Sequence, residues 1–152
     1  MERIASFCVD HTTLQPGMYL SRKDGDVLTW DIRMKRPNQG QYLSPAAAHT
    51  IEHLFATYAR NSKWSEHVVY VGPMGCLTGF YLLTQGMSDA EALALVKESF
   101  AWMAEYTGEI PGASARECGN YRMMDPVAAR REAAEMLPVL EGLDAAHLRY
   151  DA

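Results

Sequence analysis

The segment from residue 44 to about residue 61 constrains the fold most, because it combines a strong helix start with two opposite faces. Ser44 can cap free backbone N–H groups and Pro45 suits the first helical position, so a helix is predicted to begin there and run to about Asn61. At about 100° per residue, one face of this helix is apolar. Its residues are Ala47, Ile51, Leu54, Phe55 and Tyr58. Such a face must be buried against a second layer, which we expect to be a β-sheet.

Several segments have the composition of β-strands. Strands are predicted at 4–9, 27–34, 67–71 and 79–84. The pattern is clearest in the second of these, where apolar and polar residues alternate with a period of two. A further short strand is expected around Cys118.

Two more helices are predicted from their starting residues. Ser88 and Glu91 have the spacing of a capping box and open a helix that should end near Gly108. Asp125-Pro126 opens the last helix, which Pro138 should kink or end. Because the strands lack regular βαβ alternation, we expect an α+β fold: an antiparallel β-sheet with helices packed on one face, an αβ sandwich, forming a single domain over residues 1–152.

Charge and hydropathy argue against two classes of binding partner for this protein, nucleic acids and membranes. The formal net charge of −5 argues against a nucleic-acid partner held by phosphate neutralisation. No apolar run approaches the roughly 20 residues that span a bilayer, so no membrane partner is expected. The start, Met1-Glu2-Arg3-Ile4, lacks the features of an export signal. We therefore expect a cytoplasmic protein whose three cysteines are thiols, available for metal binding or catalysis.

The polar face of the first helix carries a possible metal site. His49 and His53 are four residues apart and so lie on one face, which Glu52 borders. This is the His-x-x-Glu-His pattern of inverted zincins. Cys118, followed by a glycine that permits close backbone approach, is the candidate third ligand. Two histidines and one cysteine would leave a coordination position open, as catalytic sites do. The alternatives are a solvated helix face and a buried, inert cysteine.

Three further residues are candidates for catalysis or binding. Cys76 follows Met74-Gly75 on a turn, where its thiol can act as a general base or a nucleophile. Arg33 lies on the polar face of its strand, where a guanidinium can hold a hydroxyl-rich or anionic substrate. His11 follows the first predicted strand and titrates near neutrality. The alternatives are an ordinary turn cysteine and two surface residues.

Taken together, these segments resemble the LuxS family of S-ribosylhomocysteine lyases. The matching segments are Ser6-Phe7, Asp10-His11-Thr12, Asp31-Ile32-Arg33, Arg36-Pro37-Asn38, His49-Thr50-Ile51-Glu52-His53-Leu54-Phe55-Ala56, Gly72-Pro73-Met74-Gly75-Cys76, Thr78-Gly79-Phe80-Tyr81 and Glu117-Cys118-Gly119-Asn120-Tyr121. They run in order over most of the chain. The helix motif is shared with peptidases, whereas the Pro-Met-Gly-Cys turn and the Cys-Gly-x-Tyr segment are far more specific.

The resemblance implies an activity and an assembly. It implies a homodimer with two equivalent active sites at the subunit interface. Two carbonyl migrations and a β-elimination would cleave S-ribosylhomocysteine to homocysteine and 4,5-dihydroxy-2,3-pentanedione. The second product is the precursor of autoinducer-2, so the enzyme would serve quorum sensing or salvage in the methyl cycle.

The resemblance also implies roles for particular residues. One divalent metal per subunit, physiologically Fe²⁺ with Zn or Co as substitutes, would be held by His49, His53 and Cys118. Cys76 and Glu52 match the general acid/base pair. The residues that match substrate contacts are Ser6, His11 and Arg33, to which Arg60 is added.

The chain departs from the family pattern beside the Pro-Met-Gly-Cys turn. Tyr70-Val71-Gly72 stands where many relatives carry an acidic residue and a serine, and Leu77 where a polar residue is common. These differences affect the contacts expected at the homocysteine end of the substrate.

Two other functions compete with the lyase. One competing function is a metallohydrolase in which Glu52 activates a metal-bound water. The other is a non-catalytic metal-binding or signalling module.

Overall fold

The computed structural model describes residues 1–151. Its strands and helices are β1 (Gly17–Asp24), β2 (Val27–Arg33), α1 (Pro45–Asn61), β3 (Val68–Pro73), β4 (Gly79–Gln85), α2 (Asp89–Glu105) and α3 (Pro126–Glu141). Short 3₁₀ turns lie at Ala5–Phe7, Ser65–His67 and Ala145–His147. Within the described residues, no helix is both long enough and apolar enough to cross a membrane.

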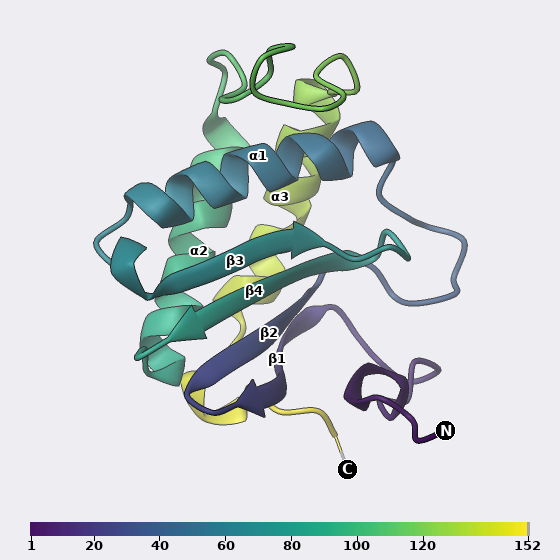
Figure 1. Cartoon of the computed structure of the whole chain (residues 1–152). Helices are drawn as coiled ribbons and strands as arrows, with labels where there is room; N and C mark the ends of the chain where they lie inside the picture. Colours follow the sequence, from purple (N-terminus) through teal and green to yellow (C-terminus); the bar gives the residue numbers. More distant parts are fainter. Residues whose placement is uncertain (152) are drawn as a thin grey trace.

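The four strands form one antiparallel sheet in the order β1-β2-β4-β3. Figure 1 shows α1 running beside the edge strand β3, with α2 and α3 behind the sheet. The α+β class and the antiparallel sheet expected from the sequence are therefore confirmed. The helix predicted to start at Pro45 has the predicted bounds, and α2 ends at Glu105, close to the expected Gly108.

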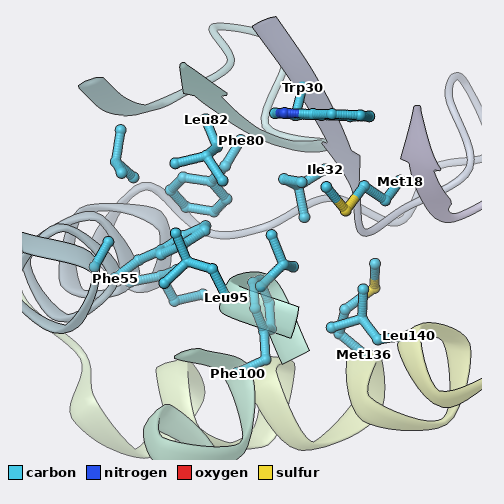
Figure 2. Packing of buried hydrophobic residues seen from close by; sticks show 14 of the residues in the cluster. Met18, Trp30, Ile32, Phe55, Phe80, Leu82, Leu95, Phe100, Met136 and Leu140 are labelled. Atoms are coloured by element: carbon cyan, nitrogen blue, oxygen red, sulfur yellow. The ribbon is translucent and has the colours of Figure 1, made fainter. Parts of the chain in front are cut away.

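The core lies between the inner face of the sheet and the helices. Figure 2 shows side chains from the strands pointing toward those of all three helices. The Phe55 ring of α1 lies 5.4 Å from that of Phe100 on α2 and 6.4 Å from that of Phe80 on β4. Because Ile51, Leu54 and Phe55 are buried, the opposite face of α1, with its two histidines, is directed away from this core.

Two predicted strands are wrong. Residues 4–9 contain a 3₁₀ turn at Ala5–Phe7, where the Cys8 amide donates to the Ala5 carbonyl, and Ile4 and Phe7 are exposed, so their apolar side chains do not form a buried strand face. Around Cys118 the described chain forms turns and no strand. There the amide N–H groups of Glu117 and Cys118 both donate to the Ser114 carbonyl, so local bonds take the place of a sheet ladder.

Strand β1 and the end of α3 also differ from expectation. The sequence did not predict β1, because its second half, with Arg22, Lys23 and Asp24 exposed, has no apolar alternation. Pro138 does not end α3, which continues to Glu141. Proline loses only its own N–H, and its carbonyl still accepts from the Gly142 amide at 3.2 Å, which completes the last turn.

The capping box at the start of α2 allows a stability prediction. The Ser88 amide donates to the Glu91 carboxylate at 3.0 Å, and the Glu91 amide donates to the Ser88 hydroxyl at 3.1 Å. Ser88→Ala should lower the free energy of unfolding by about 1 kcal/mol, since an orphan N–H loses its acceptor. Urea unfolding of the two proteins measures this. Ser65→Ala, at a serine on a 3₁₀ turn, is the control and should change the midpoint little.

Candidate metal centre and the adjoining hollows

Three potential ligands converge beside α1. His49 and His53 stand one turn apart on this helix, and Cys118 approaches from the loop that precedes α3. Their ligand atoms all lie within 4.8 Å of one another. The two Nε2 atoms are 3.1 Å apart, and the Cys118 sulfur is 3.4 Å from Nε2 of His49. The structure thus brings together the three residues that the sequence analysis singled out as metal ligands.

The hydrogen bonds of the two imidazoles fit a cation at their meeting point. His49 donates from Nδ1 to the Met123 carbonyl at 2.8 Å, and His53 donates from Nδ1 to the Pro111 carbonyl at 2.7 Å. Because a carbonyl can only accept, Nδ1 of each ring carries a proton, which leaves Nε2 as the nitrogen whose lone pair can bind a metal. Two facing lone pairs and a sulfur atom suit a divalent metal that accepts nitrogen and sulfur ligands. The residues present therefore fit the expected metal.

The loop over α1 is held close to these ligands by its backbone. Gly112 has a φ of +74°, and a Cβ at this position would lie 3.1 Å from Nδ1 of His53. A side chain here would press on the ligand, so glycine is required. Further along, the Asp125 amide donates to the buried Thr50 hydroxyl at 2.8 Å, which ties the end of the loop to α1.

Glu52 and Arg60 lie farther along the same helix face. Both line a hollow of about 370 Å³, together with His53, Tyr70 and Gly112. Arg60 lies in the last turn of α1, and its guanidinium donates to the Val69 carbonyl of β3 at 2.8 Å, which ties the end of this helix to the start of the strand.

Cys76 lines a different hollow, at the turn between β3 and β4. This hollow has a volume of about 530 Å³. Its lining includes Ser6, His11, Arg33, Tyr42, Cys76, Thr78 and Tyr81. Cys76 is exposed, and its sulfur lies 2.9 Å from the Thr78 hydroxyl. Burial raises the pKa of Tyr81, with a further contribution from the Asp31 carboxylate, so this residue is a neutral phenol that can donate a hydrogen bond.

Arg33 is not the surface residue that its strand position alone would allow. Its side chain is 3% exposed and forms an ion pair of 2.7 Å with Asp31, which is 1% exposed. It also donates to the Thr78 hydroxyl at 2.8 Å. Neither Asp31 nor Thr78 was a candidate site residue from the sequence. An acidic and a basic residue two positions apart on one strand face were the available signal for the Asp31–Arg33 pair.

Within one chain, the candidate residues fall into two groups. The first is the metal centre with its neighbours on α1: His49, Glu52, His53, Arg60 and Cys118. The second lines the hollow at the β3–β4 turn: Ser6, His11, Arg33 and Cys76. The structure brings together the members within each group but does not place the two groups around a common cavity.

The fold and the clustered donors define a small α+β protein in which two histidines and one cysteine form a candidate metal site. A family model described as S-Ribosylhomocysteinase (LuxS) matches residues 4–145. The chain therefore belongs to the LuxS family, which confirms the resemblance seen in its motifs.

Individual relatives match over nearly the whole length. A protein named S-ribosylhomocysteine lyase from Desulfotalea psychrophila is 48% identical over 157 residues, covering 99% of this chain and 99% of that protein. Proteins of the same name from Clostridium acetobutylicum and Borreliella burgdorferi are 47% and 44% identical, again with 99% of each chain covered. These names favour a lyase over the metallohydrolase that the helix motif alone would also allow.

Proposed function

We propose that this protein is an S-ribosylhomocysteine lyase, which releases homocysteine and 4,5-dihydroxy-2,3-pentanedione, the precursor of autoinducer-2. Relatives of that name align with 99% of the chain. The observation that carries the proposal is the convergence of two Nε2 atoms and one thiol at a single point. That donor set matches what a catalytic metal with an open coordination position requires.

The metal would be held by His49, His53 and Cys118, with ferrous iron as the physiological ion and zinc or cobalt as substitutes. When bound, a divalent ion with an open position acts as a Lewis acid toward a sugar carbonyl. The carbonyls of Met123 and Pro111 keep both imidazoles in the tautomer that such binding needs.

Cys76 and Glu52 supply the proton transfers. Each carbonyl migration removes a proton from one carbon and delivers one to its neighbour. The final step removes the proton beside the ketone, the carbon–sulfur bond breaks, and sulfur leaves with the electron pair as homocysteine thiolate. A thiol and a carboxylate on opposite sides of the substrate can serve as base and acid in turn. Arg33, His11 and Ser6 would bind the substrate, with Arg60 at the other hollow.

Because Cys76 and Glu52 line separate hollows in one chain, we propose that the active site forms between two copies. Exposed apolar residues border both hollows: Phe7 and Tyr42 at the first, and Tyr70 at the second. Apolar surface of this kind is usual at an interface. In a two-fold dimer, the Cys76 hollow of each subunit would face the metal centre of its partner, which gives two equal sites.

The proposed function also includes a domain organisation, a cellular location and a class of partner. We propose that residues 1–152 act as one domain and that the protein works in the cytoplasm, where its free thiols stay reduced. The net charge of −5 agrees with a small-molecule substrate and with no nucleic-acid partner.

A direct assay tests the proposed function. Protein purified without oxygen, with its metal content measured, is incubated with S-ribosylhomocysteine, and released homocysteine is detected with a thiol reagent. We expect multiple turnovers with Fe²⁺ or Co²⁺ and roughly one equivalent of metal per chain. Protein that holds metal yet releases no homocysteine with iron, cobalt or zinc would refute the proposal.

A further inference from the structure

The C-terminal segment reaches the buried ion pair beside the Cys76 hollow. Leu148 is fully buried, and its carbonyl accepts from the Leu20 amide of β1 at 2.9 Å, so the segment is held against this edge strand (Figure 1). Two residues later, the Tyr150 ring stacks on that of Tyr19 with 4.9 Å between centroids. Its hydroxyl then donates to Asp31 Oδ2 at 2.6 Å. Tyr150 therefore contacts the same carboxylate that binds Arg33.

These contacts continue as a chain of hydrogen bonds to Cys76 on the turn between β3 and β4. Asp31 Oδ2 accepts from both Tyr150 and Arg33. The other terminal nitrogen of Arg33 donates to Thr78, whose hydroxyl lies 2.9 Å from the Cys76 sulfur. Bonds that surround a buried charge pair are strong, because the local dielectric is low. The orientation of the guanidinium therefore depends on what holds Asp31.

The guanidinium of Arg33 keeps donors for a ligand. Each terminal nitrogen carries two N–H groups, and one of each is used, toward Asp31 and toward Thr78. Nε lies on the same side of the group as the nitrogen that binds Asp31; among the described residues, neither this buried Nε nor Oδ1 of Asp31 has a hydrogen-bond partner. Arg33 lines the hollow that contains Cys76, so the terminal N–H groups that remain can meet a substrate oxygen there.

Tyr150 is suited to act as a permanent donor. Burial raises its pKa well above the ordinary value, and the neighbouring Asp31 carboxylate raises it further. The phenol therefore keeps its proton throughout the neutral range. Without this donor, Asp31 Oδ2 would lose one of its two partners, and the carboxylate would be free to turn with its bound guanidinium.

We propose that Tyr150 is a positioning residue: by holding Asp31, it fixes the guanidinium of Arg33 at the wall of the Cys76 hollow, where this group binds the substrate. This inference rests on the proposed lyase function for its effect on turnover, but the placement of Arg33 is independent of it. The substrate would meet the guanidinium through a hydroxyl or carboxylate oxygen, because only an acceptor can pair with its N–H groups.

Steady-state kinetics of Tyr150→Phe test the effect on the reaction. The variant keeps the ring stack and loses only the hydroxyl. KM for S-ribosylhomocysteine should rise about tenfold with kcat changed less than about twofold, since Arg33 acts in binding. The matched control is Tyr19→Phe, which removes the other hydroxyl of the stack, one that donates to the Gln15 carbonyl. Equal KM values for Tyr150→Phe and wild type would overturn the proposal.

A double-mutant cycle shows whether Tyr150 acts through Arg33. Arg33→Lys keeps the positive charge beside Asp31 but loses the fork that reaches Thr78 and the substrate. In this background, Tyr150→Phe should raise KM by less than about twofold, because the group it positions is gone. An undiminished tenfold rise would mean that Tyr150 acts by another route, as a generally destabilising change would.

A measurement without turnover separates this inference from the proposed function. The Nε–H signal of Arg33 in a nitrogen-15 NMR spectrum is assigned by its loss in Arg33→Lys. In Tyr150→Phe this signal should shift and exchange faster with solvent, and in Tyr19→Phe it should stay unchanged. If wild type released no homocysteine, the proposed function would fail while this test still stood. An unchanged signal in Tyr150→Phe would sink the positioning role whatever the activity.

Discussion

Cys118→Ala will lose its metal and its turnover together. The three donors meet within 4.8 Å, and removing the sulfur leaves two imidazoles on one helix face as the only ligands. Loss of residues that merely support a ligand weakens metal binding about 10–100-fold, so loss of a ligand should exceed that range. Metal content by mass spectrometry after gel filtration should fall from about one equivalent per chain to under about a tenth of one.

The chain contains a matched control for this experiment. Cys8 is also a free cysteine, but it is exposed and lies outside the cluster of metal donors, and its thiol donates to the Ile4 carbonyl at 3.6 Å. Cys8→Ala should keep both metal and activity. Stoichiometric metal in Cys118→Ala, with wild-type circular dichroism, would show that the cysteine is not a ligand.

Cys76→Ala should keep its metal and lose turnover. Cys76 lies outside the cluster of metal donors and lines its own hollow, so metal content should equal that of wild type. Loss of a positioned acid or base should lower kcat by roughly 10²–10⁴-fold. The same assay for homocysteine release measures this, and wild-type kcat in the variant would remove Cys76 from the mechanism.

Mixing two inactive variants tests where Cys76 acts. If each active site takes Cys76 from one subunit and Glu52 from the other, a mixed dimer of Cys76→Ala and Glu52→Gln contains one intact site. Random exchange of subunits after mild denaturation and refolding should then restore about one quarter of the wild-type sites. Mixing Glu52→Gln with Cys118→Ala, whose changes lie in the same group beside α1, should restore none. Equal recovery in both mixtures, or in neither, would contradict the shared site.

Much of the fold follows from local patterns in the sequence. Ser44, Ser88 and Asp125 accept backbone N–H bonds at the starts of the three helices, as their residue types predict. The apolar alternation of the second strand buries Trp30 and Ile32 as expected. Strand β1 was missed because an edge strand with a charged, exposed half needs pairing with β2 to become regular, and pairing is not a local property.

The candidate site, like the fold, follows partly from local sequence patterns and partly from contacts between distant segments. By itself the sequence determined that His49, Glu52 and His53 share a helix face, because a spacing of three and four is built into the helix. Only the tertiary structure decided that Cys118 meets them, since the loop over α1 has no regular pattern and takes its course from packing and from the Thr50 contact. Burial of the Asp31–Arg33 pair, and the reach of Tyr150 to it, likewise depend on segments far apart in sequence. Helical periodicity is encoded in neighbouring residues, whereas the meeting of distant segments is decided by the packing of the whole chain.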